Sequence, residues 1–221
     1  MDTAAQVTPH KETARVLLES AILCFAEKGF DGTSIREIAD MAGKQVSLIG
    51  YHFGNKEGLY LSCFQHMFTR FPRTPLRPVR GGLDAIRKDR HLAAQVLRSA
   101  IQGIVQDMFA DDGDPLKESF IRLFMMEMRS PRPVLHELYL ERISDTVQLL
   151  RTCIASLQPN LPNTEVSFLG QSILGQCLIH RLAAGMNALV WQPLPPFASP
   201  QATADRIADF VLQGLGYRGR P

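Results

Sequence analysis

The stretch that decides the fold is Thr33–Leu59, TSIREIADMAGKQVSLIGYHFGNKEGL. Ser34, followed three residues later by Glu37, fits a capping box at the start of a helix. Apolar residues then recur at helical spacing until Gly43, and glycine suits the left-handed conformation that often ends a helix. The first short helix of this stretch is therefore expected to begin near Ser34 and to stop at Gly43.

A second short helix is expected over Gln45–Phe53, and Asn55 is expected to cap a third helix that runs to about Arg70. In the second helix, Val46, Ile49 and Phe53 share the inward face. The residues left pointing outward are Gln45, Ser47, Leu48, Tyr51 and His52. Two short helices joined by a glycine-containing turn are typical of a helix-turn-helix, whose second helix enters the DNA major groove.

The segment AGKQVSLIGYHFGNKEGLY resembles the DNA-binding signature of the TetR/AcrR family of bacterial transcription regulators, and the match extends over about residues 9–70. GKQVSLIGYHFGNKE and the later GQCLIHR are similar to the CecR-like subgroup. The sequence departs from the common family pattern in three places. Lys44 and Gln45 replace Val-Ser, Ser47 replaces a glycine, and Gly50 replaces a tyrosine that often contacts phosphate.

This resemblance implies double-stranded DNA as a partner. Base edges are expected to be read from the start of the second helix, because glutamine pairs well with adenine and lysine with guanine. Phosphates are expected at caps and helix N-termini. The candidate DNA-binding residues are Thr33, Lys44, Gln45, Ser47, Leu48, Tyr51, His52 and Lys56. For Tyr51 and His52, packing between helices remains an open alternative.

Helical patterns fill the rest of the chain, and no segment alternates convincingly as a strand. The expected helices are residues 9–29, 83–110 with a break near Asp89, 115–129, 131–157 with a break near Tyr139, 164–184 capped by Asn163, and 200 to Gly214 or Gly216, with a short extra turn near 186–191. Four of these helices begin with a proline that follows a capping residue, and the expected caps are Thr8, Asp114, Ser130 and Ser199. The core of the N-terminal helices is expected to hold Val16, Leu17, Ile22, Leu23, Phe25, Ala26, Phe30, Ile35, Ile38, Val46, Ile49 and Phe53.

We therefore predict an all-α fold. Residues 1–54 form a three-helix DNA-binding domain, and residues 55–221 form a larger regulatory and dimerisation domain, with helix 55–70 as the connector. Residues 71–82, FPRTPLRPVRGG, read as a basic loop, either an added DNA contact or simply solvated.

Length and composition are those of an ordinary globular chain of 221 residues with a formal net charge of +2. Residues 1–72 hold seven Lys and Arg against eight Asp and Glu, so the DNA-binding domain is not basic overall.

No apolar run approaches the roughly 20 residues of a membrane span, and the N-terminus lacks a signal-peptide pattern. The four cysteines show no paired spacing, and we expect free thiols in a cytoplasmic protein.

The family resemblance also implies a homodimer, formed by the last two long helices, and a small-molecule effector enclosed by the middle helices. The candidate ligand-binding residues are Phe120, Phe124, Glu127, His180 and Arg181. Glu127 and Arg181 are hypothesised to approach each other, because an unpaired charge within apolar helices is costly. An internal or interface ion pair without a ligand role is an equal alternative.

Enzymatic function has little support, because the histidines are scattered and no metal-ligand spacing, phosphate loop or nucleophile motif occurs. We predict no catalytic residues, no metal and no cofactor. The favoured function is a ligand-responsive repressor that binds a palindromic operator as a homodimer. An activator or an effector-independent regulator is the first alternative. A helical protein-interaction module without DNA binding is the alternative of another class.

Overall fold

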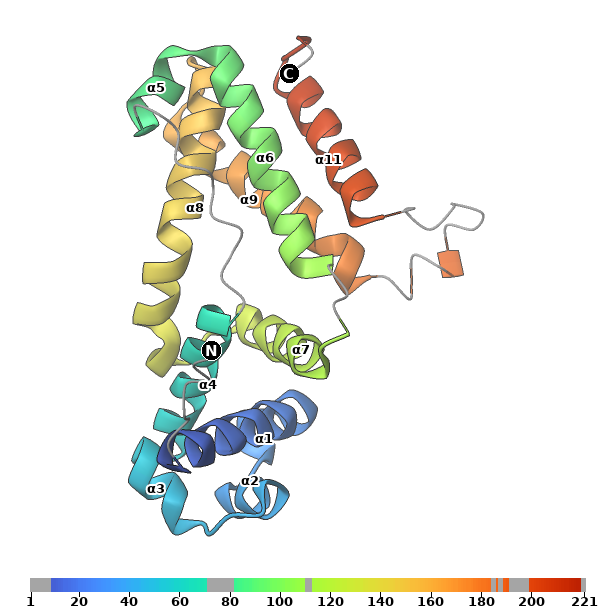
Figure 1. Ribbon diagram of the computed structural model, residues 1–221. Helices are drawn as coiled ribbons and strands as arrows, with labels where there is room; N and C mark the ends of the chain where they lie inside the picture. The colour runs from blue at the N-terminus through green and yellow to red at the C-terminus, as the bar shows by residue number, and fades with distance from the viewer. Residues whose placement is uncertain are drawn as a thin grey trace, which may run out of the picture. The chain divides into compact units, whose positions relative to one another are not determined.

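The computed structural model describes residues 9–70, 82–109, 113–183, 186, 189–190 and 199–219. The elements among these residues are helices, with no strand, which confirms the all-α prediction (Figure 1). The chain forms two compact units. Unit 1 takes its described residues from 1–72 and 112–139, and unit 2 takes its own from 73–111 and 140–221. None of the described helices is long and apolar enough to cross a membrane.

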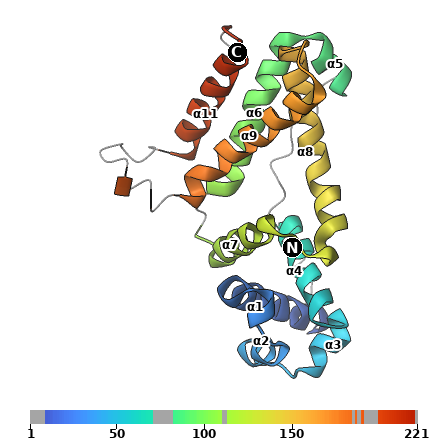
Figure 2. The same cartoon turned by 180° about the vertical axis from the view of Figure 1, so that it is seen from behind.

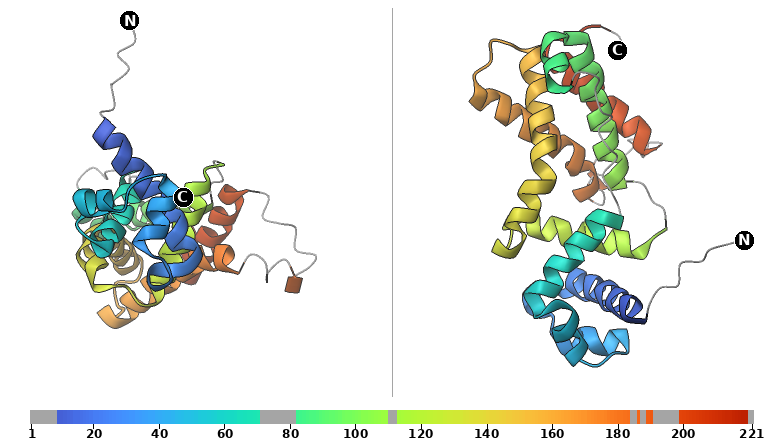
Figure 3. Two further views of the ribbon diagram at one scale, coloured as in Figure 1. Left: turned by 90° about the horizontal axis from the view of Figure 1, so that it is seen from below. Right: turned by 60° about the vertical axis from the view of Figure 1, so that its left-hand side comes forward.

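Unit 1 contains the helix-turn-helix. Its N-terminal elements are α1 (Pro9–Gly32), α2 (Ile35–Ala42), α3 (Ser47–Phe53) and α4 (Lys56–Arg70). The chain returns to this unit with α7 (Pro115–Arg129), the 3₁₀ turn η1 (Pro133–Leu135) and the first residues of α8 (His136–Leu157). Figure 3 shows α7 lying alongside α1, with which it shares an extensive contact.

Aromatic side chains join these elements of unit 1 into one core. Tyr60 of α4 lies edge-on to Phe25 of α1, with ring centroids 4.8 Å apart. Phe64, one turn further along α4, lies 5.3 Å from Phe120 of α7 and 5.9 Å from Tyr139 of α8. Such edge-to-face pairs add about 0.5–1.5 kcal/mol beyond the area they bury. Helices α4, α7 and the start of α8 therefore complete the core on which α1, α2 and α3 pack.

The compact units divide the chain at places other than residues 54 and 55, because α4 and α7 bury their apolar faces in unit 1. The division into a DNA-binding domain of residues 1–54 and a regulatory domain of residues 55–221 describes function, not compactness. It stays a prediction.

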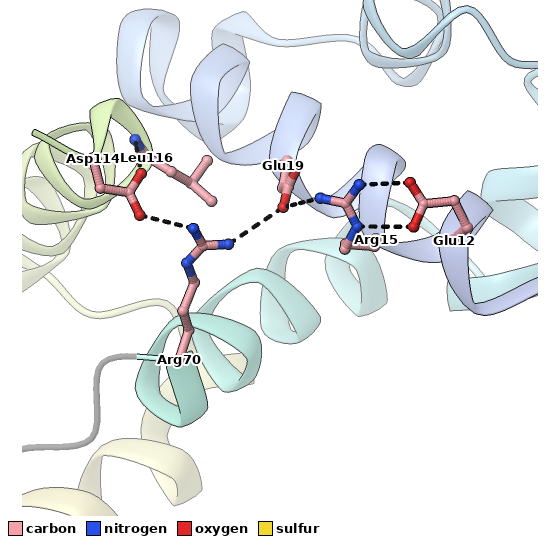
Figure 4. Close-up of polar contacts among 6 residues, drawn as sticks. All are labelled: Glu12, Arg15, Glu19, Arg70, Asp114 and Leu116. Carbon is pink, nitrogen blue, oxygen red and sulfur yellow. Dashed lines mark hydrogen bonds and ion pairs between the residues drawn. The ribbon is translucent and has the colours of Figure 1, made fainter. Parts of the chain in front are cut away.

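A chain of ion pairs follows the surface of unit 1, as Figure 4 shows. Arg15 bridges Glu12 and Glu19, with its Nη2 and Nη1 atoms 2.5 and 2.7 Å from carboxylate oxygens. Arg70 at the end of α4 bridges Glu19, at 3.4 Å, and Asp114, at 2.8 Å. Because these side chains are exposed to solvent in part or in full, each pair contributes little to folding stability. The series nevertheless connects α1, α4 and the cap of α7.

Unit 2 is also built from helices. It contains α5 (Gly82–Lys88), α6 (Arg90–Phe109), most of α8, α9 (Asn163–Leu182) and α11 (Pro200–Gly214). Helices α6 and α11 run side by side in Figure 1, and α9 lies across α6 in the reverse view of Figure 2. The expected break near Asp89 is confirmed, since this residue separates α5 from α6 and accepts hydrogen bonds from the backbone of the next turn.

The predicted caps are largely confirmed. Ser34 accepts a hydrogen bond from the Glu37 N–H, and Asn55 accepts one from the Gly58 N–H. Asp114 and Ser199 cap α7 and α11, each followed by proline. The expected cap at Thr8 and the basic loop at 71–81 lie outside the described residues, as do residues 191–198 and most of the extra turn near 186–191.

Two other helix starts were predicted wrongly. Ser130 caps the C-terminus of α7, and α8 begins only at His136, after the extended Arg132 and the turn η1. The prolines on both sides of Arg132 keep the backbone out of helix there. Helix α8 then continues without a break at Tyr139. Asn163 is the first residue of α9 rather than its cap, which is Pro162.

Three expected core residues are exposed. Ile35 and Val46 are each 37% exposed, because they lie at the very starts of α2 and α3, beyond the packed turns. Leu23 is 38% exposed, because it lies on the solvent side of α1, between the buried Ile22 and Cys24. All four cysteines are free and buried.

Candidate nucleic-acid interface

The turn between α2 and α3 has the geometry that the sequence predicts. Gly43 ends α2 with φ 61° and ψ 37°, and its N–H and that of Lys44 donate to carbonyls of the last turn. A side chain at this left-handed position would be strained. Lys44 and Gln45 follow at once and are exposed. The glycine therefore sets the direction from which α3 begins.

Helix α3 presents most of its surface to solvent. Ile49 is its buried residue, at 1% exposure, while Leu48 and Phe53 pack at the margin of the unit 1 core. Ser47 is exposed, and Tyr51 is 71% exposed, which is unusual for so large a ring. A short helix with one anchored side presents an outer face for recognition rather than for core packing.

A close backbone approach fixes the end of α3 against α4. Gly58 lies in the first turn of α4, and a Cβ atom added there would be 2.1 Å from the carbonyl oxygen of Phe53. That separation is far inside van der Waals contact. Only glycine therefore lets α4 start so close to the last residue of α3, and Asn55 between them caps the new helix.

An aromatic cluster ties the start of α1 to α3. The ring of His10 lies 4.4 Å from that of His52 and 5.6 Å from that of Tyr51, both edge-on. Burial, and secondarily the charge of His10, lower the pKa of His52 below its ordinary value. His52 therefore favours the neutral form and packs between helices, while the exposed Tyr51 remains available to a ligand.

Thr33 lies differently from the other candidates. It is 2% exposed, and its hydroxyl is 3.1 Å from the carbonyl oxygen of Cys24 and 2.8 Å from that of Gly29. The hydroxyl thus secures the turn that follows α1 and does not face solvent. Thr33 therefore supports the interface from beneath and is not part of its exposed surface.

The net charge of residues 1–72 understates how many of their cations could bind DNA phosphates, because several of the acids are already paired. Within residues 1–72, four acids form ion pairs: Glu12 and Glu19 with Arg15, Glu37 with Lys28, and Asp31 with Arg132. The hydrogen bond from Lys28 holds the pKa of Glu37 below its usual range. Among the residues that the structure describes, Lys11, Arg36 and Lys44 make no ion pair. These cations are therefore available to phosphates.

Lys56, the first residue of α4, lies against an aromatic ring. Its Nζ atom is 4.4 Å from the centroid of Phe30, at the end of α1. The guanidinium carbon of Arg132 is 4.2 Å from the same centroid. A cation over a ring face gains about 0.5–1 kcal/mol at partly exposed sites. Phe30 thus restricts where Lys56 can reach.

The candidate ligand residues fall in both units. Phe120, Phe124 and Glu127 lie on α7 in unit 1, where Phe120 and Glu127 are 8% and 6% exposed. His180 lies on α9 in unit 2, and burial lowers its pKa. The side chain of Arg181 lies outside the described residues, so its pairing with Glu127 stays a prediction.

Glu127 has partners that sequence reasoning missed. The Tyr60 hydroxyl donates to its Oε1 at 2.7 Å, and the backbone N–H of Arg132 donates to its Oε2 at 2.8 Å. Burial, then the hydrogen bond to Glu127, raise the pKa of Tyr60. No local pattern links residues 67 positions apart. A buried acid does signal the need for donors, but not which residues supply them.

Known proteins match this chain over its whole length. The family model "Bacterial regulatory proteins, tetR family" matches residues 17–63, which include the helix-turn-helix. The model "HTH-type transcriptional dual regulator CecR, C-terminal domain" matches residues 93–215, more than half of the chain.

Individual relatives agree with these two models. The dual regulator CecR of Shigella flexneri is 26% identical over 99% of both chains. The repressor AcnR of Corynebacterium efficiens is 38% identical over 58 residues, which are 26% of this chain and 31% of AcnR. A TetR-like regulator from Rhodococcus sp. RHA1 has the same fold, with a TM-score of 0.61 at 19% identity, over 92% of this chain and 96% of that one. These relatives are named as transcriptional regulators and not as enzymes. The chain therefore belongs to the tetR family of helix-turn-helix, DNA-binding transcription regulators, with a C-terminal domain of the CecR kind.

Proposed function

We propose that this regulator is a ligand-responsive repressor that binds a pseudo-palindromic operator as a homodimer in the bacterial cytoplasm. The observation that carries the proposal is the outer face of α3 and of the turn before it, where Lys44, Gln45, Ser47 and Tyr51 are exposed beside the anchored Ile49. Lys44 and Gln45 would reach base edges, and Tyr51 and Lys56 would contact phosphates. Leu48 and His52 would support this face from its margin.

Unit 2 supports a homodimer. Phe168, Ile179 and Leu182 of α9 are 63%, 49% and 59% exposed, and Phe210 of α11 is 65% exposed. A Cβ added at Gly175, on the same helix, would meet nothing within 4 Å. Large apolar side chains exposed on two adjacent helices favour burial against a second copy. Twofold symmetry would then place two α3 helices in successive major grooves about 34 Å apart.

Control by an effector is the finer part of the proposal. Residues 1–54 would read DNA, residues 55–221 would bind the effector and dimerise, and helix 55–70 would connect them. Phe120, Phe124, Glu127, His180 and Arg181 are the ligand residues that we propose. Effector and operator would weaken each other's binding by about 1–3 kcal/mol of coupling. An effector response that is unchanged in a folded Glu127→Gln variant would remove Glu127 from this list.

Activation is a second candidate at some promoters. The full-length relative from Shigella flexneri is named a dual regulator, whereas AcnR is named a repressor. Reporter fusions to the flanking genes, with and without the regulator, would separate the two directions of control.

Selection of random and genomic DNA fragments by the purified protein tests DNA recognition directly. We expect enrichment of a twofold-symmetric site, bound by two chains, with an affinity that falls steeply as salt rises. A folded protein that enriches no fragment at low salt would contradict the proposal and would favour a protein-interaction module instead.

A further inference from the structure

Unit 1 contains a series of polar contacts that starts at a buried acid and ends beside the helix-turn-helix. Glu127 is 6% exposed, and both of its carboxylate oxygens are engaged. Oε1 accepts from the Tyr60 hydroxyl at 2.7 Å and lies 3.5 Å from Nε of Arg132. Oε2 accepts from the backbone N–H of Arg132 at 2.8 Å. The backbone N–H of Arg132 is therefore hydrogen-bonded to this carboxylate, and the Arg132 side chain lies within ion-pair distance of it.

The other end of Arg132 reaches the last turn of α1, just before the start of α2. Its Nη2 atom forms an ion pair with Asp31, and its guanidinium carbon lies 4.2 Å from the ring centroid of Phe30. These two residues precede Thr33 and Ser34, where α2 begins. A planar guanidinium is suited to binding a carboxylate and a ring at once.

Phe30 extends the series to α4. Its ring also lies 4.4 Å from Nζ of Lys56 and 4.9 Å from the ring of Tyr60. Lys56 follows directly on the turn that ends α3. Arg132 thus contacts Asp31 next to the start of α2, and through Phe30 it adjoins the start of α4. The start of α2 therefore lies next to a direct contact of Arg132, whereas the start of α4 is linked to Arg132 only through the ring of Phe30.

We propose that Arg132 is a positioning residue for operator recognition, which fixes the helix-turn-helix through Asp31 and Phe30 and is itself fixed by Glu127. This inference rests on the proposed DNA-binding function. Arg132 does not contact DNA in this account, because its charge is already taken up by Asp31 and Glu127. Asp31 is 82% exposed, so its ion pair adds little to folding stability. The ion pair between Asp31 and Arg132 instead acts on the orientation of the helix-turn-helix.

The test uses the full-length chain and a DNA fragment that the wild type has selected from a random pool. Operator affinity, salt dependence and urea unfolding are measured for Asp31→Asn, Arg132→Gln and the double variant. Glu27→Gln is the matched control, since Glu27 is an exposed acid one turn earlier in α1 and makes no ion pair among the described residues. We expect Asp31→Asn and Arg132→Gln each to weaken operator binding roughly three- to thirty-fold, with the wild-type salt slope retained.

The direction in which operator affinity changes in Asp31→Asn separates a positioning role from general electrostatics. Removal of a negative charge from a DNA-binding protein should strengthen binding through general electrostatics, as expected for Glu27→Gln. Weaker binding by Asp31→Asn, and a double variant no worse than Arg132→Gln alone, would show that the two residues act through one contact. Arg132→Lys should recover part of the affinity, because it keeps a cation for Asp31.

Three results would overturn the positioning role. They are tighter or unchanged binding by Asp31→Asn, additive losses in the double variant, and a salt slope reduced by about one unit in Arg132→Gln, which indicates a direct phosphate contact. A wild-type chain that selects no DNA would contradict the proposed function itself. Variants that bind like a binding-competent wild type would contradict the positioning role alone.

Discussion

The Tyr60 hydroxyl donates a 2.7 Å hydrogen bond to Oε1 of Glu127, so a residue of α4 is joined to a buried acid of α7 that lies 67 positions later. Such a carboxylate would be costly to bury without donors. With Tyr60 and Arg132 supplying them, Glu127 becomes a structural centre of unit 1. Any role in effector binding would therefore act on residues that also support the helix-turn-helix.

Replacement of Glu127 by alanine should destabilise unit 1 by about 2 kcal/mol or more, since two donors lose their acceptor in a buried site. Glu127→Gln should cost less, because an amide oxygen can still accept from Tyr60. Tyr60→Phe should cost about 1 kcal/mol. Urea unfolding followed by circular dichroism measures all three. An alanine variant within about 0.5 kcal/mol of wild type, as for a surface substitution, would contradict this account.

Two glycines near the proposed interface should respond oppositely to alanine. At Gly58 the new Cβ would be 2.1 Å from the Phe53 carbonyl oxygen, so the backbone must shift, and we expect a loss of about 1–3 kcal/mol. At Gly50, inside α3, the new Cβ meets nothing within 4 Å, and helix propensity should stabilise by up to about 1 kcal/mol. Unfolding midpoints of the two variants provide the comparison, and equal midpoints would show the close approach at Gly58 to be absent.

Much of unit 1 could be predicted from sequence because its signals are local. Ser34, Gly43, Asn55 and Asp114 each act within four residues of the helix end they define. The contacts of Glu127 could not be predicted, since they depend on how distant helices pack. Local signals also fail when they compete. Ser130-Pro131 looks like a helix start, yet Ser130 ends α7 with its N–H bonded to the Glu127 carbonyl.

The proposed site was predictable in part. The spacing in α3 correctly anchors Ile49 and exposes Tyr51, because helical periodicity decides which side chains face out. It failed for Val46, which lies before the first turn of α3. The buried Thr33 could not be distinguished from an exposed cap, since only the packing of α1 shows that its hydroxyl turns inward.

A charge placed on the exposed apolar face of unit 2 should prevent dimer formation. Phe210→Glu puts a carboxylate where a ring is 65% exposed on α11, and burial of that carboxylate against a second copy would be costly. Light scattering should show a monomer that binds operator more weakly. Leu140→Glu, at a residue 72% exposed on α8, is the control and should remain dimeric. Dissociation by the control but not by Phe210→Glu would place the interface elsewhere.

Folding stability should fall as pH drops below about 7, and His66 should account for part of the change. Its Nε2 atom is buried without a hydrogen-bond partner among the described residues, and burial lowers its pKa. Glu19 opposes this shift, while Arg70 and Arg15 add to it. Between the unfolded value near 6.5 and the lower folded value, the unfolded chain binds the extra proton.

The contribution of the neutral His66 to folding stability is therefore lost as pH falls through that window, and it is fully present above it. Urea unfolding at several pH values should give a smaller slope for His66→Gln than for wild type. Identical slopes would show that the His66 ring is protonated as easily in the folded chain as in the unfolded one.

The central claim is that the face beginning at Lys44 and Gln45 reads the operator. The most direct measurement is the affinity of a Lys44→Ala/Gln45→Ala double variant for a fragment selected by wild type. Lys88→Ala, which removes an exposed lysine from α5 of unit 2, serves as the control. We predict that the double variant loses about 1–3 kcal/mol of operator-binding free energy for each base contact removed, and that its sequence preference is relaxed. Its folding should be unchanged, and Lys88→Ala should bind the fragment like wild type. A folded double variant that binds the fragment as tightly and as selectively as wild type would contradict the account.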